Sequence, residues 1–116
     1  MKEYSIQNKS LVTPDFRVEF ESRINVIEKM DDIFLILLEV EKGSTDVDNV
    51  YGVDKFGRVV WRIQSITEAF RIAQNTPYIA LKVIDSEKAQ VTSFFGMRFT
   101  FSIHNGRMLE KECIGW

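Results

Sequence analysis

The chain of 116 residues has little of what usually marks a chemical site, with one histidine, one cysteine and two prolines. The single cysteine, Cys113, has no second cysteine for an internal disulfide, so nothing points to an oxidising compartment. No uncharged apolar run reaches the roughly 18 residues of a membrane span, and residues 1–10 lack the apolar stretch of a signal peptide. We therefore expect a cytoplasmic protein with no membrane association.

An excess of basic residues is also missing. Lys and Arg number 15 against 17 Asp and Glu, the formal net charge is −2, and the basic residues are scattered along the chain. A nucleic-acid module would normally show a basic balance or a basic face, so we expect no nucleic-acid partner. With 45% hydrophobic and 28% charged residues, the composition is that of a folded protein. The length predicts a single domain over residues 1–116.

No set of residues has the composition or spacing of a catalytic or metal site. His104 has no cluster of Cys, Asp or Glu at ligand spacing, and Cys113 has no recognisable activating base nearby. The acidic residues of the 41–49 segment lack the alternating spacing and closing Glu of a calcium loop, and Asp48 and Asn49 are typical of turns. We therefore expect no enzyme, no metal and no cofactor.

The rest of the chain is organised around residues 33–63. Residues 33–38 are apolar at every position, which predicts a strand buried on both faces at the centre of a sheet. Further on, Lys55-Phe56-Gly57 lies between the β-branched runs 50–53 and 59–63. A glycine within a short loop between two such runs predicts a tight hairpin.

Alternating patterns and turn residues predict most of the remaining strands. Residues 1–14 are polar and are expected to form a loosely held arm or an edge segment. Asn105-Gly106 predicts a type I′ turn, in which both central residues have positive φ. The additional expected strands are residues 16–20, 24–30, 78–84, 91–95, 97–103 and 108–114.

One helix is predicted over residues 66–74. Ser65 and Glu68 have the spacing of a capping box, in which the hydroxyl accepts from the Glu68 amide. Ile66, Ala69, Phe70 and Ala73 then form one apolar stripe, and Pro77 follows the expected end of the helix. A helix this short needs tertiary packing to be stable, so its Phe70 face is expected to cover a sheet.

The two halves of the chain resemble one another. Residues 33–40 match 78–84 as a buried strand, and the hairpin at 53–60 matches the one at 103–109. We therefore expect an α+β fold, mostly antiparallel, with about eight strands in a meander of two four-strand repeats. The two repeats would form a sandwich or a partly open barrel.

The hairpin sequence YGVDKFGRVVW resembles the blade hairpin of quinoprotein-type β-propellers, where Val-Asp, a Gly-containing turn and a strand with Trp follow one another. The resemblance covers about eleven residues and implies a blade-like hairpin. Residues 49–61 and 77–85 also resemble small uncharacterised bacterial single-domain proteins. That second resemblance implies an accessory or immunity-type binding protein.

The candidate interaction surface combines acidic and aromatic residues. The acidic loop would suit a partner protein with a basic surface. Phe94 and Phe95 are adjacent, so on a strand one of them points away from the core. Trp116 would dock on its own sheet or on a second subunit as a homodimer. The predicted surface consists of Asp46, Asp48, Phe94, Phe95 and Trp116.

Two hypotheses about function follow. The first is a non-enzymatic binding protein that masks a partner protein through a sheet face or edge. The alternative is a protein that binds a small apolar ligand, because the positions expected to face inward are apolar. Those positions are Ile79, Leu81, Val83, Phe99 and Phe101.

Overall fold

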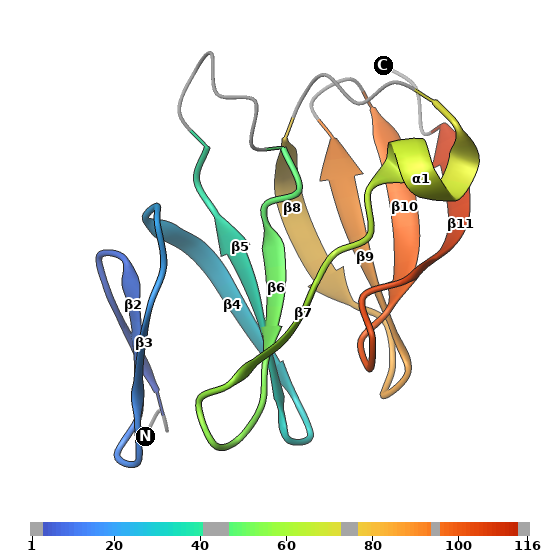
Figure 1. Ribbon diagram of the computed structural model, residues 1–116. Coiled ribbons are helices and arrows are strands. Elements are labelled where there is room, and N and C mark those ends of the chain that lie inside the picture. Colours follow the sequence, from blue (N-terminus) through green and yellow to red (C-terminus); the bar gives the residue numbers. More distant parts are fainter. Residues whose placement is uncertain (1–3, 41–46, 73–76, 94–95, 114–116) are drawn as a thin grey trace.

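The computed structural model describes residues 4–40, 47–72, 77–93 and 96–113. Three antiparallel sheets follow one another along the chain and lie side by side as layers (Figure 1). We call them the N-terminal, middle and C-terminal sheets. The N-terminal sheet has the strand order β1-β2-β3, with β1 at Ser5–Gln7, β2 at Ser10–Val12 and β3 at Arg17–Glu19.

The other two sheets are four-stranded meanders in which each strand pairs with the next one in sequence. The middle sheet contains β4 (Ile24–Met30), β5 (Ile33–Leu38), β6 (Val50–Val53) and β7 (Val59–Arg62). The C-terminal sheet contains β8 (Tyr78–Val83), β9 (Lys88–Ser93), β10 (Met97–Ser102) and β11 (Met108–Cys113). The mostly antiparallel, sandwich-like fold is confirmed, and the sheets form no closed barrel. The described residues form 11 strands rather than the expected eight, because the N-terminal sheet adds three to the two four-strand meanders.

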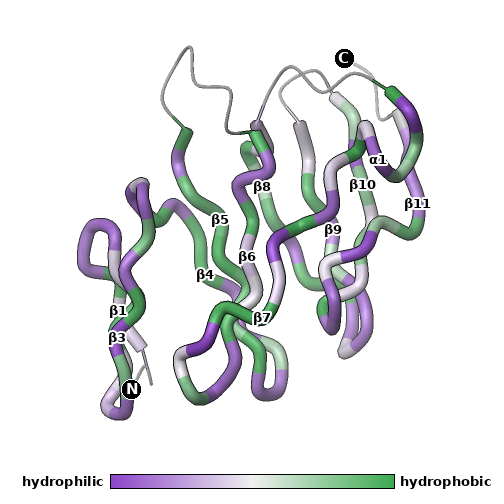
Figure 2. Tube along the Cα trace, in the orientation of Figure 1, coloured by the Kyte–Doolittle hydropathy of each residue, from purple (hydrophilic) through white to green (hydrophobic). Residues whose placement is uncertain are grey.

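Strand β5 is buried on both faces, as its unbroken apolar run predicts. Phe34, Ile36 and Leu38 belong to the core between the middle and N-terminal sheets. Leu35 and Leu37 belong to the core between the middle and C-terminal sheets. Figure 2 shows hydrophobic colour along β5. The middle sheet is therefore the inner layer of the molecule.

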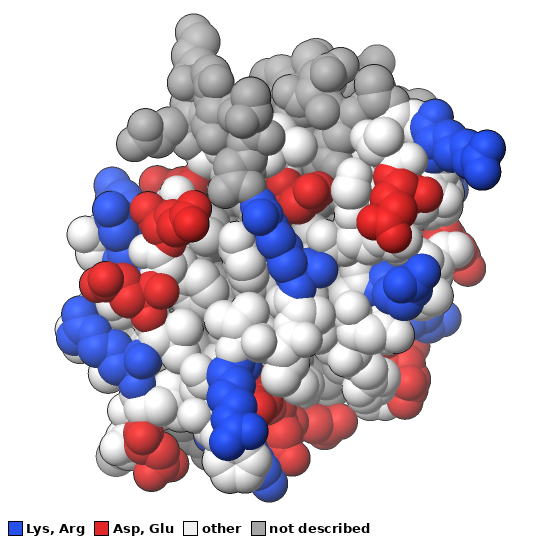
Figure 3. Space-filling view, viewed as in Figure 1, with Lys and Arg blue, Asp and Glu red and all other residues white. Residues whose placement is uncertain are grey.

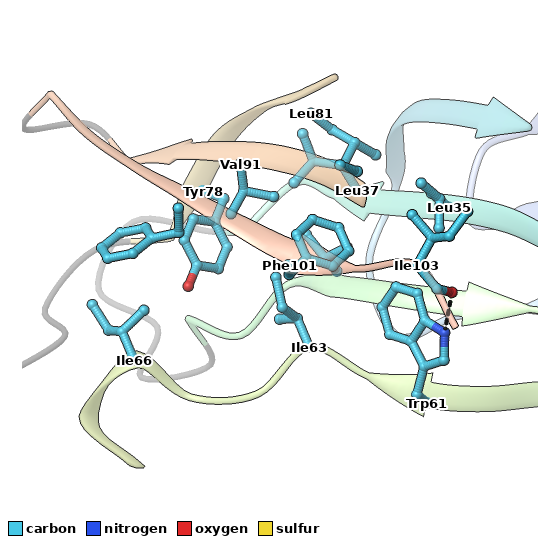
Figure 4. Packing of buried hydrophobic residues seen from close by; sticks show 13 residues of the cluster. Leu35, Leu37, Trp61, Ile63, Ile66, Tyr78, Leu81, Val91, Phe101 and Ile103 are labelled. Carbon is cyan, nitrogen blue, oxygen red and sulfur yellow. Dashed lines mark hydrogen bonds between the residues drawn. The ribbon is translucent and has the colours of Figure 1, made fainter. Parts of the chain in front are cut away.

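Trp61 joins the middle sheet to the C-terminal sheet. Its ring lies edge-on to Phe101, with ring centroids 5.7 Å apart, and its Nε1 donates to the Ile103 carbonyl at 2.9 Å (Figure 4). The indole passes so close to Gly52 and Gly106 that a Cβ at either position would lie 2.6 Å or less from a Trp61 ring atom. These two glycines therefore admit the ring to the interface.

The N-terminal sheet packs on the other face of the middle sheet. Leu11 of β2 is fully buried, and the ring of Phe34 meets those of Tyr4 and Phe16 edge-on, with centroids 5.5 and 6.0 Å apart. The expectation of a loosely held arm at residues 1–14 is therefore wrong for the described part. The alternative expectation, an edge segment, describes β1, because β1 is the outer strand of the N-terminal sheet.

Asn49 ties the middle sheet to the start of the C-terminal sheet through its buried side-chain amide. Its Nδ2 donates to the carbonyls of Leu38 and Tyr78 at 2.8 and 3.0 Å. Its Oδ1 accepts from the Tyr78 N–H at 2.9 Å. A surface turn was expected here from sequence, but the amide instead satisfies backbone groups that the two ends of these sheets leave buried.

The helix α1 covers Ile66–Phe70 and is shorter than the predicted 66–74. Ser65 Oγ accepts from the Thr67 amide at 3.1 Å, not from that of Glu68, so the predicted capping box is not formed. Arg71 then takes a left-handed conformation (φ 58°) and its N–H donates to the Thr67 carbonyl, which ends the helix. Among the described residues, no helix has the length and hydrophobicity needed to span a membrane.

The expected apolar contact of the helix with a sheet is present. The ring of Phe70 stacks on Phe99 of β10, with centroids 6.0 Å apart. Ile66 is buried in the same core. This packing supplies the stability that so short a helix lacks on its own.

Two local predictions in the C-terminal sheet are wrong. Ile79 was expected to face inward, but a β-bulge between Tyr78 and Ala80 shifts the register, so Ile79 is 46% exposed. The Asn105-Gly106 turn is not type I′, because only Gly106 has positive φ. The loop instead spans residues 103–106 and closes with a hydrogen bond from the Ser102 N–H to the Arg107 carbonyl.

The repeat is present in the topology, but the proposed strand match is not. Strand β5 is the second strand of its sheet, whereas β8 is the first strand of the next one. Burial on both faces made residues 33–40 look like a counterpart of 78–84. Position in the sheet instead makes β9 the counterpart of β5.

We predict that Asn49→Ala lowers the free energy of unfolding by about 1–3 kcal/mol, because the Tyr78 N–H and two carbonyls lose their buried partner. Urea unfolding with an unchanged m-value would measure the loss. The exposed Gln7→Ala on β1 serves as control and should change stability by less than about 0.5 kcal/mol. An Asn49→Ala variant as stable as this control would contradict the role of the amide.

Candidate binding surface

Only one residue of the sequence-predicted interaction surface lies in the described part of the chain. Asp46, Phe94, Phe95 and Trp116 lie outside the described residues. Asp48 is half-buried, and its carbonyl accepts from Arg62 Nε at 2.7 Å. Asp48 is therefore part of the packing around β6 and β7.

His104 is exposed and lies beside a carboxylate. His104 Nε2 lies 3.1 Å from Glu87 Oε2, so the histidine links the turn after β10 to the turn before β9. Within the described residues there is no group of three or more His, Cys, Asp or Glu side chains able to hold a metal ion.

The β6–β7 hairpin presents exposed apolar side chains, which we call the hairpin patch: Phe56, Val59 and Val60. Phe56 is 66% exposed, and the two valines are each 48% exposed. Strand β7 is an edge strand of the middle sheet. Its pairing with β6 passes from Trp61 to Val59 and skips Val60. Because such a bulge re-aims side chains, both adjacent valines reach the surface.

The loop that carries Phe56 is held by hydrogen bonds rather than left loose. The Asp54 carboxylate accepts from the N–H groups of Phe56 and Arg58, both at 2.9 Å. Gly57 has a φ of +83°, and a Cβ there would lie 2.7 Å from the Phe16 ring. The hairpin tip is thus ordered and rests against the turn that joins β2 to β3.

Two cations flank the exposed ring. Lys55 Nζ and Arg58 Cζ lie 5.4 and 5.8 Å from the centroid of Phe56, within the range of a cation–π contact. Figure 3 shows uncharged surface across the middle of the face on which Figure 1 draws β7, with separated basic and acidic groups around it. The aromatic ring of the hairpin patch is therefore flanked by two cations.

A cleft of about 370 Å³ lies beside the hairpin, between the N-terminal and middle sheets. We call it the basal cleft. Lys29 Nζ lies 5.6 Å from the Phe34 ring centroid, and Lys55 Nζ lies 4.0 Å from Asp32 Oδ2 at the rim. The lining residues are Thr13, Pro14, Asp15, Phe16, Lys29, Asp32, Phe34 and Lys55.

Lys55 connects the two features, because it lines the basal cleft and also lies over Phe56. Two smaller clefts lie elsewhere on the described part of the chain. One of about 360 Å³, near the far end of β5, is lined by Asn8, Lys9, Glu21, Ser22, Arg23 and Glu39. The other, of about 200 Å³, lies on the outer face of the C-terminal sheet and is lined by Ala80, Leu81, Lys82, Gln90, Thr92 and Arg98.

Sequence reasoning identified the hairpin but not its role as a surface. The signal was present, because Phe56 is a large aromatic at the tip of a tight turn, where the chain leaves little room to bury it. The cleft could not be inferred, since it needs Phe16 and Phe34 from two different sheets to meet.

The comparisons with known proteins place the chain in a family. Residues 1–113 match the family described as "Domain of unknown function (DUF7957)". The chain belongs to this family. None of the curated proteins matches it. The family description carries no activity or partner, so the functional argument rests on the geometry above.

Among solved structures, the fold is similar to the crystal structure of the computationally designed Ika8 protein, with a TM-score of 0.61 and 11% sequence identity. The match covers 97% of this chain and 36% of the designed one. The chain thus spans about a third of the length of that designed protein. At this identity the likeness concerns the fold alone. The quinoprotein-type character of the β6–β7 hairpin stays a prediction.

The phenol of Tyr51 predicts how the stability of the fold depends on pH. Tyr51 lies beside Arg62 on the middle sheet. Burial raises the pKa of its phenol above the ordinary 10.0, and the Glu21 and Asp48 carboxylates raise it further. Because the folded phenol keeps its proton where the unfolded one has lost it, stability should fall as pH rises above 10. The denaturant midpoint should fall between neutral pH and a pH above 10, and it should fall less in the Tyr51→Phe variant than in the wild type. Equal falls in the two proteins would contradict the prediction.

Proposed function

We propose that this chain is a non-enzymatic binding protein that docks another protein on the hairpin patch. The observation that supports the proposal is the cluster of Phe56, Val59 and Val60, adjacent along an ordered hairpin and each about half exposed or more. Exposed apolar patches rimmed by polar groups are typical of interaction sites. Aromatic and Arg side chains are also enriched at protein interfaces.

A protein partner fits this surface better than a small apolar ligand. Small-molecule sites usually bury 70–90% or more of the ligand's surface in a concave pocket, whereas Phe56 stands on a hairpin tip. The inward apolar positions considered for the ligand hypothesis are occupied by packing, since Phe99, Phe101 and Leu81 share one core with Leu35 and Trp61. The ligand hypothesis therefore loses its expected cavity within these sheets.

The proposal also covers the role, the location and the oligomeric state of the protein. An accessory or immunity-type role rests on the resemblance carried by residues 49–61 and 77–85, and the hairpin patch falls within the first of these segments. A cytoplasmic location rests on the single cysteine, which leaves no pair for an internal disulfide. A homodimer through the hairpin patch is a competing occupant, and the experiment below separates it from a different partner.

The test is affinity capture from the native host with the tagged protein and its Phe56→Ser variant, quantified by mass spectrometry. We expect a stoichiometric partner whose recovery falls at least about fivefold with Phe56→Ser, since truncating a central aromatic anchor usually costs more than 1 kcal/mol. Because Phe56 is largely exposed, the variant should keep the wild-type melting temperature.

Leu109→Ser is the matched control, because Leu109 is 49% exposed on β11 of the C-terminal sheet. It should retain the partner fully. Equal recovery with Phe56→Ser and Leu109→Ser would overturn the proposal, and so would a wild-type protein that retains nothing. If only the untagged chain itself is captured, the hairpin patch binds a second copy of the chain, and the proposal of a different partner is wrong.

A further inference from the structure

We infer that the basal cleft and the hairpin patch together bind an acidic segment of the partner, with one apolar side chain of that segment seated against Phe16. The inference rests on the proposed function and names the chemistry of the partner. It differs from the sequence expectation of a basic partner, because that expectation depended on the acidic 41–49 segment.

The charge of the hairpin opposes the charge of the whole chain. Residues 54–62 carry Lys55, Arg58 and Arg62 against Asp54, a formal charge of +2, while the chain has −2. The Asp54 carboxylate is also engaged by two backbone N–H groups within the loop. Complementary charge steers a partner toward the correct surface, so an acidic segment is favoured at this hairpin.

The cleft supplies an apolar seat at the same place. Phe16 is half-buried and Pro14 is exposed in its lining. The buried Phe34 supports Phe16 from beneath, with the two rings edge-on and their centroids 6.0 Å apart. Thr13 Oγ1 accepts from the N–H groups of Asp15 and Phe16, both at 3.1 Å, which fixes the turn that carries Phe16. A volume of about 370 Å³ lies at the lower end of ligand-pocket sizes and suits a side chain rather than a large ligand.

The cations stand beside the apolar surfaces. Lys29 lies over Phe34 and Lys55 over Phe56. An apolar side chain in the cleft therefore brings the carboxylates of its sequence neighbours close to both ammonium groups. The cleft also carries Asp15 and Asp32, so its own charge is balanced and the positive excess comes from the hairpin.

Asp32 does not hold Lys55 tightly. The two charged groups are 4.0 Å apart, and their side chains are 74% and 58% exposed. Exposed pairs of this kind contribute little. A carboxylate of the partner can therefore take the place of Asp32 beside Lys55, because breaking the exposed Asp32–Lys55 pair costs little free energy.

The test uses two synthetic peptides with the same Leu-Phe centre, one flanked by Asp and Glu and one flanked by Lys. They are titrated into the labelled full chain by NMR. The acidic peptide should shift the backbone amides of residues 55–60 and of Lys29 and Phe34 in a saturable way, and more weakly at high salt. The double variant Lys55→Glu with Arg58→Glu should weaken this binding at least about tenfold.

Lys82→Glu with Arg107→Glu is the matched control, because both side chains are exposed on the C-terminal sheet. It should leave the affinity unchanged. Equal binding of the two peptides, shifts confined to the C-terminal sheet, or an unchanged affinity of the hairpin double variant would each overturn the inference. If Phe56→Ser abolishes partner capture while the acidic peptide does not bind, the proposed function stands and only the acidic chemistry fails.

Discussion

Burial of β5 on both faces is the constraint on which the rest of the structure depends. Six consecutive apolar residues, Ile33–Leu38, cannot be covered by a single packed layer, because alternate side chains of a strand point to opposite faces. The N-terminal sheet covers Phe34, Ile36 and Leu38, and the C-terminal sheet covers Leu35 and Leu37. Trp61 and Asn49 then fix how the C-terminal sheet sits against the middle one.

This arrangement limits where the proposed partner can bind. Both faces of the middle sheet are used for folding, and the outer face of the C-terminal sheet carries Lys82, Gln90 and Arg98. Strand β11 carries Glu110, Lys111 and Glu112, charges of the kind that discourage edge pairing. The β6–β7 hairpin instead brings three apolar side chains to the surface and lies beside a cleft formed where two sheets meet.

The sequence predicted most of the strands because their patterns are local. The unbroken run of β5 and the Gly57 hairpin both follow from short stretches of chain. The errors arise where tertiary structure decides: the bulge after Tyr78 turns Ile79 outward, and Leu11 is buried only because β5 offers it an apolar face. The proposed binding surface was missed for the same reason, since its cleft is formed where the Phe16 turn meets Phe34 of the middle sheet.

The most direct test of the three-layer account is the stability of two neighbouring β5 variants, Leu35→Ala and Ile36→Ala, measured by urea unfolding. Each residue is fully buried and each faces a different sheet, so each variant should lose about 2–5 kcal/mol. The exposed Ile84→Ala should change stability by less than about 0.5 kcal/mol. If either β5 variant behaved like this control, one face of the middle sheet would not be packed, and the account would be wrong.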